Sequence, residues 1–164
     1  MTAQDFKKTV LTHMQEVLKP ERFRKKQSLF WLEHDDVVLF VQLQSSRMST
    51  KDYLRATVNL GIFSKTVAEA VGNTHEPNIY EAHWDQRIGQ LFPAPHDKWW
   101  HIHKDKDAEL AGREIAAFMK IKALPVMEGL ASTDSLKALW ETGRSPGQTD
   151  FQRQEYLRAL GARV

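Results

Sequence analysis

Two arginines and one tryptophan carry the clearest chemistry in this sequence. Arg55, Arg87 and Trp99 each fall in a stretch where polar and apolar residues alternate, on the polar parity. A guanidinium group binds carboxylate or phosphate through two parallel hydrogen bonds, and a neighbouring aromatic wall keeps water away from the bound group. We therefore expect Arg55 and Arg87 to hold an anionic ligand, and we expect Trp99 rather than Trp100 to lie on the open face.

The same parity adds three further candidates, which are Gln42, Asn59 and His83. We expect Asn59 and His83 to orient the ligand. An enzyme of unknown reaction with a pocket at Arg55, His83 and Arg87 is an alternative. A second alternative is a solvated sheet face on which Arg87 pairs with Asp85 or Asp52, because open antiparallel faces are commonly polar.

Other kinds of site have weaker support. His101 and His103 would lie on one face of a strand at a spacing that zinc can use, but the sequence fixes no third ligand. There is no cysteine, no GxSxG or SxxK motif and no glycine-rich phosphate loop. We therefore predict no metal site, no catalytic residue and no cofactor.

Two β-strands that share one apolar face must position the candidates. From Val37 to Gln44 the valines and leucines of one parity alternate with Val38, Phe40 and two glutamines, and a clearer alternation runs from Tyr53 to Phe63. A one-residue slip would expose every apolar side chain, so the register is well specified. The opposite parity, from Phe40 and Gln42 to Phe63, is expected to form an open polar-aromatic face.

The rest of the chain is expected to cover the apolar face or extend the sheet. Pro20 ends an amphipathic helix that starts with a weak capping signal at Thr2, and Thr149 with Gln152 forms a capping box. The other expected elements, in order, are a helix over 2–18, a basic turn over 22–26, strands over 29–33, 83–92 and 97–103, a short helix over 65–71, an irregular segment over 73–81, a helix over 107–122 interrupted by Pro125, a short turn over 126–130, and helices that begin near Ser132 and at Thr149, the last closed by Gly161.

A helix, then a run of strands, then helices is the α+β pattern. We predict an antiparallel sheet of about five strands with helices packed on one face, in a single domain over 1–164. Because 164 residues can bury a sizeable core, no disulfide staple is needed.

Charge and composition narrow the choice of partner. The net charge is only +2, but residues 1–26 hold seven Lys or Arg against three Asp or Glu. A nucleic-acid-associated protein that uses the basic segment 19–26 is therefore an alternative, although the near-neutral total does not favour it. The sequence has no signal core and no apolar run of transmembrane length, and the lack of cysteine fits a reducing compartment. We expect a cytoplasmic protein without a membrane partner.

Several short motifs in this order and spacing resemble one family. They are Phe23 with Lys25-Lys26, Ser45-Ser46-Arg47, Thr57 to Gly61, His83-Trp84 with Arg87-Ile88-Gly89, and Asp97 to Trp100. Over roughly residues 5–130 the chain resembles domain of unknown function 4304, a family of mostly bacterial proteins. The resemblance implies a small stand-alone α+β domain and implies no activity. From the residues we expect a non-enzymatic binding or adaptor domain, for a small anionic ligand or a protein partner.

Overall fold

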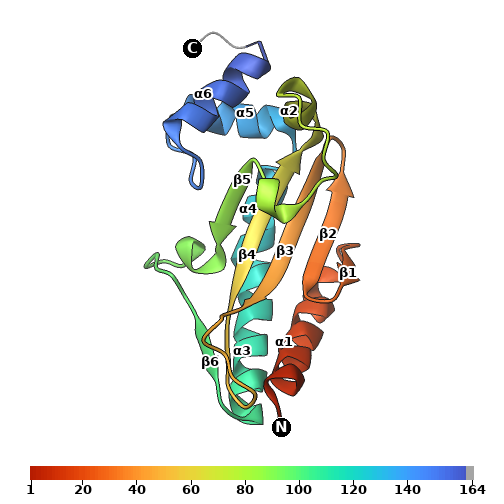
Figure 1. The fold of residues 1–164 in the computed structure, drawn as a ribbon, viewed down its shortest axis with the longest axis vertical. Coiled ribbons are helices and arrows are strands. Elements are labelled where there is room, and N and C mark those ends of the chain that lie inside the picture. The colour runs from red at the N-terminus through yellow and green to blue at the C-terminus, as the bar shows by residue number, and fades with distance from the viewer. Residues whose placement is uncertain (162–164) are drawn as a thin grey trace. The chain divides into compact units, whose positions relative to one another are not determined.

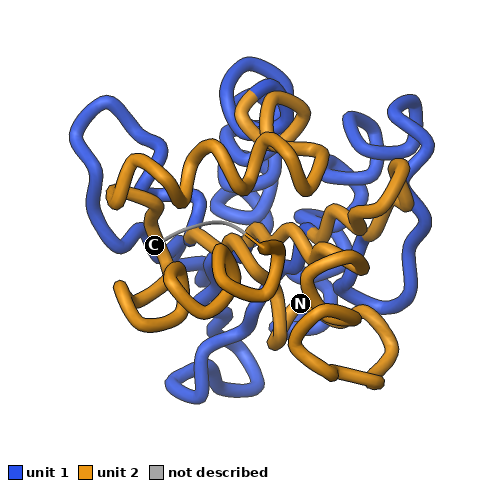
Figure 2. The backbone as a smooth tube through the Cα atoms, turned by 90° about the horizontal axis from the view of Figure 1, so that it is seen from above, with its two compact units in different colours: residues 1–30, 41–59, 87–125 blue, residues 31–40, 60–86, 126–164 orange. Residues whose placement is uncertain are grey.

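The computed structural model describes residues 1–161, which group into two compact units. Unit 1 comprises Met1–Phe30, Val41–Asn59 and Arg87–Pro125, and unit 2 comprises Trp31–Phe40, Leu60–Gln86 and the chain from Val126 onward (Figure 2). The prediction of a single domain stays a prediction.

Helices flank a run of strands along the chain, as the α+β pattern predicted (Figure 1). In order, the elements are α1 (Ala3–Leu18), β1 (Arg24–Lys26), β2 (Leu29–His34), β3 (Val37–Ser45), β4 (Leu54–Ser64), α2 (Lys65–Ala70), the 3₁₀ turn η1 (Ile79–Glu81), β5 (Trp84–Arg87), the 3₁₀ turn η2 (Ile88–Leu91), β6 (Trp100–Ile102), α3 (Asp105–Phe118), the π-helical turn η3 (Met119–Ala123), α4 (Leu124–Gly129), α5 (Thr133–Glu141) and α6 (Asp150–Ala159).

The sheet contains six strands in the order β1-β2-β3-β4-β5, and β6 also pairs with β4. β6 runs antiparallel to β4, with Leu54 opposite Ile102 and Arg55 opposite His101. The predicted fold class is confirmed, with one strand more than the five expected.

In unit 1 the sheet has one buried and one partly exposed face. Leu54, Ala56 and Val58 of β4 are buried, whereas Arg55 and Asn59 on the opposite parity are partly exposed. Two helices bury their apolar stripes within the same unit, because α1 packs against α3. Each fully buried valine or leucine contributes about 1.5–3 kcal/mol, so this one-sided burial fixes which parity stays open.

The start of α1 is held by the capping box that the sequence indicated. The Thr2 side chain accepts a hydrogen bond from the Asp5 N–H, and the Asp5 carboxylate accepts one from the Thr2 N–H at 2.8 Å. These two bonds satisfy backbone donors that a helix leaves without partners in its first turn.

We expect Thr2→Ala to lower the free energy of unfolding by about 1 kcal/mol, the usual effect of losing an N-cap. The matched control is Thr12→Ala, because Thr12 is exposed inside the same helix and its hydroxyl donates only to the Lys8 carbonyl. Urea unfolding followed by circular dichroism would measure both. Equal effects of the two substitutions would contradict the capping role.

Unit 2 buries both faces of its segments of β3 and β4. Phe40 and Phe63, which we placed on the open face, are 4 % and 1 % exposed. That part of the prediction is wrong, because unit 2 packs side chains against both parities, as the His83 ring does against Phe63 at 5.0 Å. Alternation along a strand shows which residues share a face but not whether a second layer covers it.

A hydroxyl network holds the start of α5 in unit 2. The Asp36 carboxylate accepts hydrogen bonds from the Thr66 hydroxyl at 2.7 Å and from the Thr133 hydroxyl and N–H, and Ser64 and Thr133 share a hydrogen bond at 2.6 Å. Burial alone would raise the pKa of Asp36, but these hydrogen bonds outweigh it and the pKa lies below its usual value. Asp36 is therefore a structural carboxylate as well as a turn residue.

Three predicted elements differ from the structure in extent. The strand expected over 83–92 ends at Arg87, because the Gly89 carbonyl accepts hydrogen bonds from the Phe92 and His96 N–H groups and the chain turns. The strand expected over 97–103 is reduced to β6. The basic turn expected over 22–26 contains strand β1.

Pro125 does not interrupt the helical structure as we expected. It is the second residue of α4, directly after the π-helical turn η3. Proline lacks the N–H that would continue an α-helical ladder, and a wider turn before it makes room for its ring. The segment 126–130, expected as a turn, lies mostly in α4.

Within residues 1–161, no helix combines the length and the apolar character needed to cross a membrane.

Candidate functional site

The open face of unit 1 is built by alternating residues of β4 and β6. Arg55 lies opposite His101, so Thr57 is next to Trp99 and Tyr53 next to His103. Period-2 alternation points these side chains to one face. Thr57 is fully buried, and its hydroxyl donates to the Lys98 carbonyl at 2.6 Å.

Trp99 brings the two predicted arginines together. The guanidinium carbon of Arg55 lies 4.2 Å from the centre of the Trp99 ring, and that of Arg87 lies 4.9 Å from it. Both distances are within the range of an attractive cation–π contact. Trp99 is partly exposed and Trp100 is buried, which agrees with our expectation that Trp99 faces the open side.

Asp97 completes this cluster. Both of its carboxylate oxygens accept from Arg87 Nη1, at 3.0 and 2.9 Å, and one also accepts from the Trp99 indole N–H at 3.0 Å. Desolvation acts to raise the pKa of Asp97. These hydrogen bonds and the charges of Arg87 and Arg55 outweigh that effect, so the pKa lies below its usual value. Arg87 therefore has an acidic partner, although it is neither Asp85 nor Asp52.

Each guanidinium group keeps donors available. Arg55 Nη1 donates to the Ser46 hydroxyl at 3.0 Å, and Arg87 uses only Nη1 for Asp97. Among the residues that the structure describes, none accepts a hydrogen bond from Nε or Nη2 of either arginine, and none forms an ion pair with Arg55. The cluster can therefore accept an additional anionic group.

Asn59 and Gln42 lie beside each other on this face. Asn59 Nδ2 donates to Gln42 Oε1 at 3.3 Å and to Gln44 Oε1 at 2.7 Å. The Asn59 amide is thus oriented by two glutamines on β3. Five of our six candidate residues lie in unit 1, three of them in the arginine–tryptophan cluster and two in this amide pair.

A second aromatic group lies at the end of the same face. Tyr53 stacks on His103 with ring centres 4.5 Å apart, and its hydroxyl is 2.6 Å from Nδ1 of His101. Both histidines are exposed. In the described part of the chain, no group of three or more His, Asp or Glu side chains could hold a metal ion.

His83 does not belong to this face, and that prediction is wrong. It lies in unit 2, is 3 % exposed, and its Nδ1 accepts a hydrogen bond from the Ser64 N–H at 2.9 Å. Its ring packs against Phe63 and Tyr156. Burial lowers the pKa of His83 to about 4, and the charge of Glu81 opposes this only in part. His83 is a neutral core histidine.

Sequence reasoning missed Asp97 and Ser46 as partners of the arginines. Asp97 precedes Trp99 by two residues, so strand periodicity alone could have placed both on one face. Ser46 lies in the loop between β3 and β4, where no periodicity applies, and no comparable signal was available.

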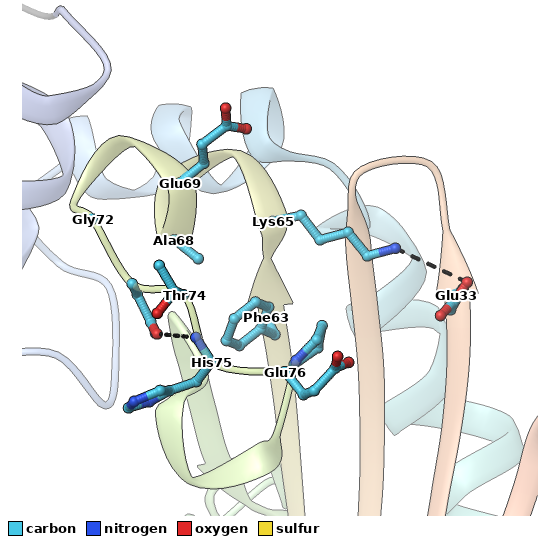
Figure 3. Close-up of a pocket in the computed structure, with 11 residues that line it drawn as sticks. Glu33, Phe63, Lys65, Ala68, Glu69, Gly72, Thr74, His75 and Glu76 are labelled. Carbon is cyan, nitrogen blue, oxygen red and sulfur yellow. Dashed lines mark hydrogen bonds and ion pairs between the residues drawn. The ribbon is translucent and has the colours of Figure 1, made fainter.

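Unit 2 contains a cavity of about 430 Å³ that the sequence did not indicate (Figure 3). The lining residues are Glu33, Phe63, Lys65, Ala68, Glu69, Gly72, Asn73, Thr74, His75, Glu76 and Pro77. The Glu81 carboxylate holds the loop on one side by accepting from Asn73 and Asn78 and pairing with His75. None of the six candidate residues is among those that line this cavity.

The fold and the face together define a class, an α+β domain whose antiparallel sheet presents a polar-aromatic surface. The chain belongs to the family named domain of unknown function (DUF4304), whose model matches residues 14–129. No curated protein and no solved structure gave a significant match to the chain. The resemblance seen in the sequence is thereby confirmed, and the function has to be argued from the site.

Proposed function

We propose that this protein is a non-enzymatic binding module that holds a carboxylate or phosphate group of a ligand or partner protein on the open face of unit 1. The observation that carries the proposal is the pair of guanidinium groups, Arg55 and Arg87, against the one ring of Trp99. Nε and Nη2 of both arginines are without a partner among residues 1–161. An anionic group that contacts these donors would form charge-assisted hydrogen bonds with them, and bonds of this kind are the strong ones.

A binding role is better supported than catalysis. The enzyme alternative needed His83 beside the arginines, but the described contacts of its ring are with Ser64, Phe63 and Tyr156. A general acid or base must lie within hydrogen-bond reach of the reacting group, and its pKa should be near the working pH. A buried histidine with a pKa of about 4 lacks both properties here. A cytoplasmic location is part of the proposal, supported by the absence of cysteine.

The test is a titration of ¹⁵N-labelled protein with inorganic phosphate and, separately, acetate. We expect the side-chain Nε–H signals of Arg55 and Arg87 and the indole N–H signal of Trp99 to shift together and to saturate in the millimolar range. Arg55→Gln should abolish the saturation, whereas Arg113→Gln, which removes an exposed arginine of α3, should leave it intact. Shifts that persist in Arg55→Gln would contradict the proposal.

Asp97→Asn should strengthen anion binding about fivefold, equivalent to about 1 kcal/mol. The substitution removes the negative charge that competes for Arg87, while the amide oxygen can still accept one of its hydrogen bonds. Glu114→Gln removes one negative charge from the exposed surface of α3 and is the matched control. The same phosphate titration measures both, and equal gains would show that only net charge matters.

A further inference from the structure

The basic strand β1 belongs to the same open face as the arginine–tryptophan cluster. Two-residue turns at 27–28 and 35–36 join β1 to β2 and β2 to β3, so Lys26 pairs with Leu29 and Leu29 with Gln42. The hydrogen bond from the Leu43 N–H to the Ser28 carbonyl fits this register, and Asn59 Nδ2 reaches Gln42. Lys26, Leu29, Gln42 and Asn59 therefore form one row across four strands.

Positive charge lies at both sides of this face. β1 is the edge strand, and Arg24, Lys25 and Lys26 are all exposed. Within residues 1–161 none of the three forms an ion pair, although eight ion pairs exist elsewhere. Arg24 and Lys26 share a strand parity, so both point to the face that holds Gln42. Arg55 and Arg87 supply the charge on the opposite side.

The span between the charges fits an extended molecule. Adjacent strands are about 4.8 Å apart, so the three spacings from β1 through β2 and β3 to β4, which carries Arg55, cover about 14 Å. A small anion contacts only one side of such a face. An extended polyanion contacts both.

The groups between the charges favour nucleic acid over an acidic peptide. Trp99 and the Tyr53–His103 stack present partly exposed rings, on which bases can stack irrespective of their sequence. Both N–H groups of the Asn59 amide are held by Gln42 and Gln44, so its carbonyl oxygen is the atom that can accept a hydrogen bond from a base edge. The side chains of an acidic peptide have no flat rings that would stack on these aromatic groups. In addition, a short, lysine-rich edge strand of three residues disfavours the addition of a peptide strand.

We propose that the open face of unit 1 binds single-stranded nucleic acid, with phosphates on Arg24, Lys26 and Arg55 and bases against the aromatic rings. The inference rests on the proposed function, because it names the kind of partner whose anionic groups the Arg55–Trp99–Arg87 cluster would hold.

The test is fluorescence anisotropy with a labelled oligothymidylate of about 12 nucleotides and the full chain, at several salt concentrations between about 50 and 200 mM. The variants are Arg24→Gln with Lys26→Gln at the edge, and Arg55→Gln at the centre. The control is Lys120→Gln with Lys122→Gln, which removes two exposed cations of η3 in the same unit. A polyglutamate peptide of equal length serves as competitor.

We expect the edge variant to weaken binding about tenfold at low salt. It should also reduce the slope of log K against log salt by about 1.4, because each lost phosphate contact on a single strand accounts for about 0.7. Arg55→Gln should reduce affinity as well, and the control should match the natural protein.

Four outcomes would overturn the inference. If Arg55→Gln weakens binding and the edge variant does not, the ligand is a compact anion and the proposed function stands. If polyglutamate displaces the oligonucleotide at equal or lower concentration, or the oligonucleotide does not bind, the partner is not nucleic acid. If only the edge variant weakens binding, the arginine–tryptophan cluster is not the site and the proposed function fails too.

Discussion

Gly89→Ala is expected to lower the free energy of unfolding by about 3 kcal/mol. A Cβ atom at this position would clash with the His96 carbonyl oxygen and would lie 2.8 Å from the Lys98 backbone nitrogen. Both are backbone atoms, so the clash cannot be relieved by rotating a side chain. Overpacking usually costs 1–3 kcal/mol, and contacts with fixed backbone belong at the upper end.

The same substitution should disturb the candidate site. The new methyl group would displace His96 and Lys98, which flank Asp97. Lys98 also directly precedes Trp99. We therefore expect the indole N–H signal of Trp99 to move and phosphate binding to weaken. Urea unfolding measures the stability, and the phosphate titration measures the site.

Gly129→Ala is the matched control for Gly89→Ala. Gly129 ends α4, and a Cβ atom there would have no neighbour within 4 Å. Alanine is also the better helix former, so this variant should be as stable as the natural protein or slightly more stable. If Gly89→Ala behaved like Gly129→Ala, the close approach of the 96–98 segment to Gly89 would be wrong.

The second large effect is a loss of stability in mild acid, caused by His83. Its pKa in the folded protein is about 4, against an ordinary value of 6.5 for histidine, because burial disfavours the charged ring. A depressed pKa means that the stabilisation is complete above pH 6.5 and is lost as the pH falls from 6.5 to 4. The shift corresponds to about 3 kcal/mol over this interval.

The hydrogen bond to His83 explains why protonation is so unfavourable. Nδ1 accepts from the Ser64 N–H, so the neutral ring must carry its proton on Nε2. Protonation of Nδ1 would place two donors against each other inside the protein. The Tyr156 ring, packed edge-to-face at 5.1 Å, helps to keep water away.

Urea unfolding at pH 7 and at pH 4.5 would measure this effect. His83→Asn keeps an acceptor for the Ser64 N–H but does not titrate. In this variant, the part of the stability difference between pH 7 and pH 4.5 that comes from His83 should therefore mostly disappear. His103→Asn, at an exposed position, should retain the full difference. A direct titration of the His83 ring by NMR that gave a pKa near 6.5 would contradict the prediction.

The helix caps and the strand alternation of this fold could be predicted because they depend on residues that are close together in the chain. The Thr2 and Thr149 capping boxes involve residues three positions apart, and both exist. The alternation from Leu54 to Val58 correctly identified the buried parity of β4, because the strand period is set by backbone geometry. These signals were sufficient for the α+β class and for the starts of α1 and α6.

The candidate site could be predicted only in part. Strand periodicity was enough to predict which side five of the candidates share. These five lie in unit 1 on the open face, and they are Arg55, Asn59, Gln42, Arg87 and Trp99. Their contacts depended on which strands pair and in what register. β6 pairs with β4 although the paired residues Arg55 and His101 are 46 positions apart in the sequence, and only that pairing sets Trp99 beside Arg55.

Tertiary structure alone decided the role of His83 and the ends of the short strands. His83 has the parity of a polar face, but in unit 2 a second layer of side chains, including Tyr156 of α6, covers it. Gly89 ends β5 because the 96–98 segment folds back against it. Sequence periodicity records which residues share a face, whereas the partners that cover that face come from distant parts of the chain.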